Sequence, residues 1–167
     1  MGFLKDFFRG FTTNTNEIIA EGNKGLFEYY KKQEGLDYIE IIPTRVVWGI
    51  EREYGEISNI LLFKDRLRFN TKIKGNYRDL LLKDIITVEV LTDTQIEQKS
   101  KLGQMMLIGI FALATKPKTE EITKRKLVIN AKESGIDFSV IVDTTEDSLI
   151  VAKKVNKFVE ECKGQSS

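Results

Sequence analysis

The 167-residue chain contains no histidine and only one cysteine, Cys162. Without histidine, the chain lacks the side chain that proteins use most often as a general base and as a metal ligand. A Ser-His-Asp or Cys-His catalytic group cannot exist, and a zinc site would have to consist mostly of carboxylates. No glycine-rich phosphate-binding motif is present either. These absences predict a protein that is not an enzyme and that holds no metal and no cofactor.

The chain also has few of the features that mark exported or membrane proteins. Its longest apolar run, Met105 to Ala114, is far shorter than the ~20 residues of a membrane-spanning helix. The N-terminus has no basic region followed by an apolar core, which a signal peptide needs. Only two prolines occur, and no segment has low complexity. We therefore expect a cytoplasmic protein, with the inner face of the membrane as an alternative location.

Alternating apolar and polar residues predict β-strands through the middle of the chain. The expected strands are 38–42, 45–50, 57–64, 67–69, 86–90, 127–131 and 136–142. Residues 102–115 are interpreted as a buried apolar strand, with a helix as the alternative, because periodicity does not separate the two in an apolar run. Pro43 separates the first two, because proline cannot donate to a ladder of hydrogen bonds. Lys64-Asp65 predicts a tight turn, and Glu133-Ser134-Gly135 predicts a hairpin. For residues 92–103 the sequence indicates only a polar stretch.

Helical periodicity marks the N-terminal part of the chain. Residues 1–35 predict a helical arm, in which a second helix begins near Asn14 with Glu17 as its capping partner. Gly35 is expected to end the helix, since glycine favours that position. The predicted organisation is this arm, one domain at 38–162 and a disordered tail at 163–167.

An amphipathic helix from about Glu146 to Cys162 closes the chain. Thr144 and Asp147 fit the spacing of a capping box at its start. The side chains expected to be buried are Leu149, Ala152, Val155, Phe158, Val159 and Cys162. Short strands followed by one such helix predict a mainly β (α+β) fold, in which the helix covers one end of a bent sheet.

In this order of elements the chain resembles bacterial PH-like (pleckstrin-homology-like) domains, a group that includes GRAM-like modules. Three stretches carry the resemblance: LLFKDRLRF at 61–69, LKDIITV at 82–88 and LIGIFALATKPK at 107–118. An arginine is common where this chain has Gln104. The resemblance covers residues 38–162. It implies a barrel of two near-orthogonal antiparallel sheets, capped by the C-terminal helix, that serves binding rather than catalysis.

The basic residues of the middle segment are the first candidate site. The formal net charge is only +1, but residues 64–126 hold fourteen basic and eight acidic side chains. In PH-like domains, basic residues on the loops can hold anionic headgroups, and lysine and arginine both suit phosphate. The candidate ligands are Lys72, Lys74, Arg78, Lys116, Lys118 and Lys124. The alternative is a solvated loop surface, since Glu120 and Glu121 lower the net positive charge around Lys116, Lys118 and Lys124.

An apolar stripe in the N-terminal arm is the second candidate. The candidate contact residues are Phe3, Leu4, Phe7, Phe8 and Phe11. They fit packing on the chain's own domain, insertion into a membrane interface, or contact with a protein partner. The sequence thus predicts a non-catalytic binding or scaffolding module that contacts a membrane peripherally, with protein–protein contact or self-assembly as the alternative. The small net charge predicts no nucleic-acid partner.

Overall fold

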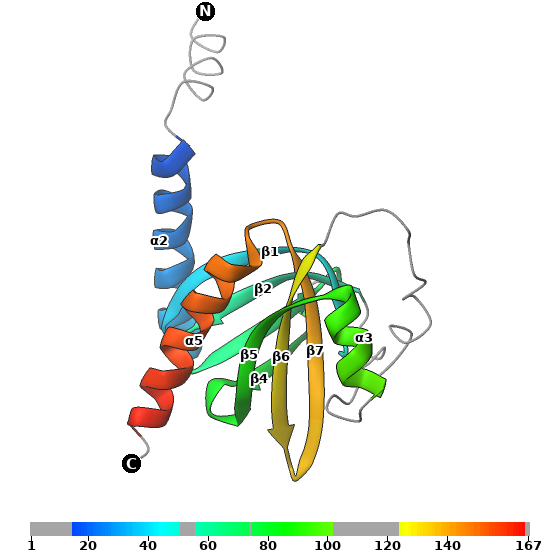
Figure 1. The fold of residues 1–167 in the computed structure, drawn as a ribbon. Coiled ribbons are helices and arrows are strands. Elements are labelled where there is room, and N and C mark those ends of the chain that lie inside the picture. Colours follow the sequence, from blue (N-terminus) through cyan, green and yellow to red (C-terminus); the bar gives the residue numbers. More distant parts are fainter. Residues whose placement is uncertain (1–14, 51–55, 74, 102–123, 166–167) are drawn as a thin grey trace, which may run out of the picture.

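The structure, a computed structural model, describes residues 15–50, 56–73, 75–101 and 124–165 (Figure 1). Its elements, in chain order, are α2 (Thr15–Glu34), β1 (Tyr38–Trp48), β2 (Ile57–Phe63), β3 (Arg66–Thr71), β4 (Tyr77–Leu81), the short 3-10 helix η2 (Leu82–Asp84), β5 (Ile85–Thr92), α3 (Asp93–Lys101), β6 (Arg125–Glu133), β7 (Ile136–Thr144) and α5 (Ser148–Gly164). The expectation of a mainly β fold with a C-terminal helix is confirmed. The predicted strand 102–115 lies outside the described residues.

All seven strands form one antiparallel sheet in the order β4-β3-β2-β1-β7-β6-β5. The sheet is open, because β4 and β5 are its two terminal strands and do not pair with each other. It bends so that β2 to β4 face β5 to β7 across a common interior (Figure 1). The closed barrel that the resemblance implies is therefore not formed by hydrogen bonding.

Strand β1 joins the two halves of the sheet. Its residues 38–43 pair with β2, and its residues 44–48 pair with β7. The prediction of two strands separated by Pro43 is wrong, because β1 runs without a break from Tyr38 to Trp48. Pro43 is tolerated where the strand changes partners: its register is shifted just beyond, between Thr44 and Val46.

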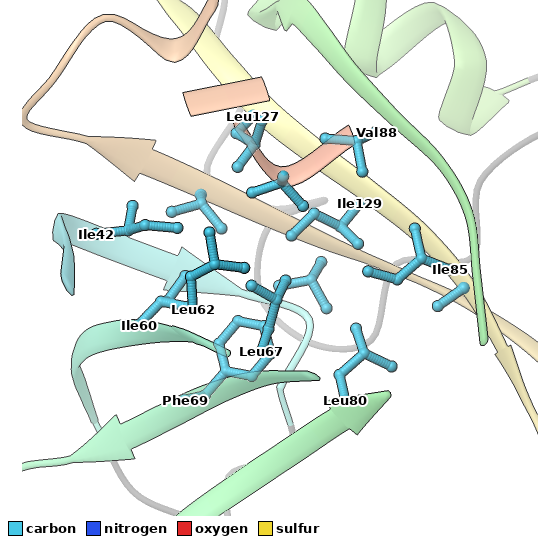
Figure 2. Close-up of a cluster of buried hydrophobic side chains, with 14 of the residues drawn as sticks. Ile42, Ile60, Leu62, Leu67, Phe69, Leu80, Ile85, Val88, Leu127 and Ile129 are labelled. Atoms are coloured by element: carbon cyan, nitrogen blue, oxygen red, sulfur yellow. The ribbon is translucent and has the colours of Figure 1, made fainter. Parts of the chain in front are cut away.

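The core fills the space between the two halves of the sheet. Figure 2 shows Leu67 and Phe69 of β3 pointing toward Ile129 and Leu127 of β6. On the open side, α5 contributes the buried side chains of Val151, Ala152, Val155 and Val159. The helix thus seals the bent sheet, as an amphipathic helix does at an open corner.

The start of α5 differs from the predicted one. Asp147 is the N-cap, and its carboxylate accepts a hydrogen bond from the Leu149 backbone N–H at 2.9 Å. Thr144 is instead the last residue of β7, and its hydroxyl donates to the Glu146 carbonyl. Because the inward stripe runs through residues 148, 151, 152, 155 and 159, Leu149 is exposed rather than buried. The helix also extends to Gly164, into the predicted tail.

Helix α3 was not anticipated from the polar stretch 92–103. Thr92 and Gln95 form a capping box, in which the Gln95 side chain accepts from the Thr92 N–H at 2.9 Å and the Thr92 hydroxyl accepts from the Gln95 N–H at 3.3 Å. Ile96 is fully buried against Leu91, Val128 and Ile141 on the outer face of the second half of the sheet. One apolar side chain therefore anchors a helix whose other residues are mostly polar.

The hairpin between β6 and β7 is confirmed, although its strands are longer than expected. Ser134 and Gly135 form the two-residue connection, with φ of 50° and 81°. Positive φ at both positions matches the twist that antiparallel strands require. Ile136, the first residue of β7, is 63% exposed, whereas the chain from Phe138 to Val142 is buried on both faces because α3 covers the outer one.

Candidate functional site

The predicted headgroup residues are only partly within the described chain. Lys72 is exposed and forms an ion pair of 2.8 Å with Glu56. Arg78 lies in β4, and Lys124 is exposed directly before β6. Lys74, Lys116 and Lys118 fall outside the described residues.

Arg78 is committed to a contact within the protein. Its side chain is 15% exposed, and Nη2 donates to Glu133 Oε2 at 2.6 Å. The guanidinium also lies 5.2 Å from the centre of the Phe138 ring. Glu133 ends β6 while Lys124 precedes it, so the two cations are separated by nearly the whole strand, roughly 25–30 Å. Arg78 and Lys124 therefore cannot hold one phosphate between them.

A second cluster lies on the outer face of β1 and β2, beneath α2. Tyr38, Leu61 and Phe63 are buried there, and Leu26 and Tyr30 of α2 pack against them. The Tyr30 ring meets Phe63 edge-on at 5.1 Å and stacks on Tyr38 at 6.0 Å. Aromatic pairs at these distances add to the effect of burial alone. We call the sheet surface formed by Tyr38, Leu61 and Phe63 the outer apolar face.

Arg68 of β3 is the charged centre of this region. The residue is 3% exposed, and its guanidinium bonds Asp79 at 2.7 Å and Glu34 at 2.9 Å. It also lies 3.9 Å from the centre of the Tyr77 ring. A forked, planar cation suits two carboxylates and an aromatic ring at once. Arg68 therefore joins the last turn of α2, through Glu34, to the first half of the sheet.

The electrostatics of the cluster follow from this packing. Burial raises the pKa of the Tyr38 hydroxyl to about 12, with the Glu40 carboxylate acting in the same direction. The hydroxyl donates to Asn23 Oδ1 of α2 at 3.0 Å. Burial also opposes the charge of Arg68, but hydrogen bonds to Asp79 and Glu34 outweigh it and raise the pKa of the guanidinium. Tyr38 thus remains neutral and Arg68 charged across the physiological range.

Outside the docked face, α2 is exposed to solvent. Phe27 is 42% exposed and Tyr29 is 56% exposed, and because they are two residues apart they lie on opposite flanks of the helix. A Cβ added at Gly22 or at Gly25 would meet no atom within 4 Å. Figure 1 agrees, since the first half of α2 extends beyond the edge of the sheet. The predicted contact residues Phe3, Leu4, Phe7, Phe8 and Phe11 precede α2 and lie outside the described residues.

The sequence interpretation missed the role of Arg68, Glu34 and Asp79. The available signal was the run Ile60-Leu61-Leu62-Phe63, which is apolar at every position. Such a run predicts a strand that is buried on both faces. Ile60 and Leu62 indeed belong to the inner core, while Leu61 and Phe63 belong to the outer apolar face. A strand that is buried on both faces needs an element that covers its outer face, and in this protein that element is α2.

No family model matches the chain, and no curated protein matches its sequence. Within the described ranges, no three acidic or cysteine side chains are grouped so that they could hold a metal ion. In that same part of the chain, no helix is long and apolar enough to cross a membrane. The candidate features are therefore those of the structure itself: the outer apolar face, on which α2 docks, and the exposed aromatic side chains of α2.

Proposed function

We propose that the chain is a non-catalytic PH-like binding or scaffolding module that acts by contacting proteins. The observation that carries this proposal is a contrast in availability between two sets of side chains. Arg78, a central residue of the expected headgroup site, is paired with Glu133, whereas Phe27 and Tyr29 stand exposed on α2. Exposed aromatic side chains beside a rigid sheet are typical of protein-binding surfaces.

The order of the elements supports the PH-like assignment. Four strands are followed by three more and by a closing helix, and β1 contributes to both halves of the bent sheet. Of the stretches that carry the resemblance, 61–69 forms the β2–turn–β3 unit and 82–88 forms η2 with the start of β5. The stretch 107–118 lies outside the described residues. We infer a PH-like fold from this order, with the gap between β4 and β5 left unpaired.

Binding of anionic headgroups is the second candidate function. The observation that favours it is that Lys124 and Arg125 are both exposed where the chain enters β6. Against it, Lys72 and Arg78 each have a carboxylate partner. The Lys72 pair is exposed and therefore weak, but Arg78 would have to leave a largely buried contact to reach a phosphate.

Affinity capture from an extract of the source cell tests the primary proposal. The full chain serves as bait beside a Phe27→Ala/Tyr29→Ala variant. The matched control is Ile136→Ala, which removes an apolar side chain that is exposed to 63% on a different element, β7. A partner retained by the wild type and the control, and lost from the double variant, is the expected result. Equal capture by all three baits would contradict a role for α2.

Vesicle co-sedimentation separates the two candidate functions. The full chain is mixed with phosphatidylcholine vesicles and, separately, with vesicles that also contain phosphatidylserine. Salt-sensitive binding to the anionic vesicles alone, reduced by Lys124→Gln/Arg125→Gln, would favour headgroup binding. We expect no such binding, because Lys72 and Arg78 are each paired with a carboxylate within the protein.

A further inference from the structure

The outer apolar face is a surface that one helix covers. Tyr38, Leu61 and Phe63 are almost completely buried, and the side chains packed against them are Leu26, Tyr30 and Leu36. Two of these three belong to α2. If α2 moved away, a contiguous apolar and aromatic face would be exposed, and monomeric proteins rarely leave such a face uncovered.

The contacts on this face select a helix with a definite pattern of side chains. Asn23 accepts from the Tyr38 hydroxyl at one end, and Glu34 pairs with Arg68 at the other, eleven residues on. Tyr30 lies between them against Phe63. An amphipathic helix that presents an amide, an aromatic ring and a carboxylate on one side is thus recognised in both position and direction.

The connection between α2 and β1 is short. It consists of Gly35, Leu36 and Asp37, and Gly35 has φ of +68°. The Gly35 N–H donates to the Lys31 carbonyl and the Leu36 N–H donates to the Tyr30 carbonyl, both at 3.2 Å. This is the left-handed helix end that glycine adopts without strain. A change of conformation at these three residues redirects the whole of α2.

Nothing in the described chain encloses α2. It is the first element of the described residues, and in Figure 1 its first half stands away from the other described elements. Gly22 and Gly25 have open space around them. Among the described residues, therefore, no loop has to open for α2 to leave the sheet as a rigid unit.

From these observations we propose that two copies of the chain exchange α2, so that each helix docks on the outer apolar face of the other copy. The contacts made between copies are the same as those within one copy, so concentration and the conformation of residues 35–37 set the balance. The inference rests on the proposed protein-binding function, and it names a second copy of the chain as one partner.

Complementary charge reversal provides the test. Glu34→Arg places two cations together at the docking contact, and Arg68→Glu adds a third carboxylate beside Glu34 and Asp79, so each variant alone should dock α2 poorly. In a mixture, exchange restores both contacts: a wild-type Glu34 meets a wild-type Arg68, and the two reversed residues meet each other. We expect about tenfold more dimer in the mixture than in either variant alone, measured by sedimentation velocity on full-length chains.

Equal dimer content in the mixture and in the single variants, with each variant folded by circular dichroism, would overturn the exchange. If Arg68→Glu does not fold, Gly35→Ala supplies an independent arm with the docking contact intact. Alanine disfavours the left-handed hinge, so this variant should form more dimer than the wild type at equal concentration. The matched control is Gly22→Ala, which adds the same methyl group to open space within α2. A monomeric Gly35→Ala protein at all soluble concentrations would also overturn the exchange.

Failure of the exchange and failure of the proposed function have different signatures. The exchange depends on the docked side of α2, through Glu34, whereas the capture experiment changes two exposed side chains of the same helix, Phe27 and Tyr29. Capture that persists while no mixed dimer forms contradicts the exchange alone. Mixed dimers without capture would leave the chain's own second copy as its protein partner.

Discussion

The two halves of the sheet are covered on their outer faces by different kinds of helix. Helix α2 covers the first half with Leu26 and Tyr30 and is tied by Arg68 to Glu34. Helix α3 covers the second half, and Ile96 is the buried residue of this helix. It follows β5 directly and is capped locally by Thr92 and Gln95, so it needs little more than one anchor. Helix α2 packs through several side chains and an ion pair, so its position depends on more directional contacts.

Each half also holds one cation that is nearly buried against an aromatic ring. Arg68 lies over Tyr77 and bonds two carboxylates, Asp79 and Glu34. In the second half, Lys126 lies 5.3 Å from the centre of the Trp48 ring and bonds Asp93. The arginine can serve several partners because its guanidinium is a planar fork, whereas the lysine ammonium acts as a point charge. The first half therefore depends more heavily on one polar residue.

The largest effect is expected from removing the ring beneath α2. Phe63→Ala should lower the free energy of unfolding by about 4 kcal/mol, because a fully buried aromatic ring leaves a cavity. Ile96→Ala, beneath α3, should cost about 3 kcal/mol, since the side chain is smaller. Urea unfolding followed by circular dichroism measures both values. A larger loss for Ile96→Ala would reverse the comparison between the halves.

The two buried cations should differ in the same direction. Arg68→Ala should lower the free energy of unfolding by about 3 kcal/mol, because Glu34 loses its ion pair with Arg68 and Asp79 keeps only the more exposed Arg66. Lys126→Ala should cost about 1 kcal/mol, since Asp93 is half exposed and can be solvated. Arg66→Ala, with a more exposed guanidinium that also reaches Asp79, is the control for Arg68 and should cost less than Arg68→Ala. Equal losses at the three positions would mean that burial does not decide the contribution.

A smaller effect is expected at the start of α3. Thr92→Ala removes the hydroxyl that accepts from the Gln95 N–H, and a lost N-cap costs about 1 kcal/mol. Thr94→Ala is the control, because Thr94 is exposed within the first turn of the same helix. Chemical denaturation of both variants should show destabilisation for Thr92→Ala only. Identical curves would contradict the local capping of α3.

The smallest effect is expected from ionisation of the Tyr38 hydroxyl, which changes the stability of the fold only at alkaline pH. Its pKa is raised from 10.0 to about 12 in the folded protein by burial, so the neutral form is favoured by folding. The stabilisation is complete below pH 10 and is lost as the pH rises from 10 toward 12. The loss of stability over this window should be smaller in Tyr38→Phe, which has no ionisable hydroxyl at this position. Stability curves that fall in parallel for the two proteins would contradict this assignment.

The sequence predicted the elements whose signals are local. The β6–β7 turn followed from Ser134-Gly135, and the end of α2 followed from Gly35, since both positions require positive φ. Helix α3 was missed although Thr92 and Gln95 carry a capping box, because its residues are mostly polar and only Ile96 faces the sheet. The continuity of β1 through Pro43 was also missed, since it depends on a change of partner strands that no local pattern records.

By itself, the amino-acid sequence determined which side chains are available: no histidine, strands with apolar positions, and one amphipathic helix at the end. Only the tertiary structure decided what those side chains do. Arg78, a candidate ligand in the sequence, is the ion-pair partner of Glu133 in the structure. Arg68, which the sequence did not single out, attaches α2 to the sheet through Glu34. The physical reason is that the role of a charge depends on its burial and on its neighbours. Both are set by residues that lie 55 positions away for Arg78 and 34 positions away for Arg68.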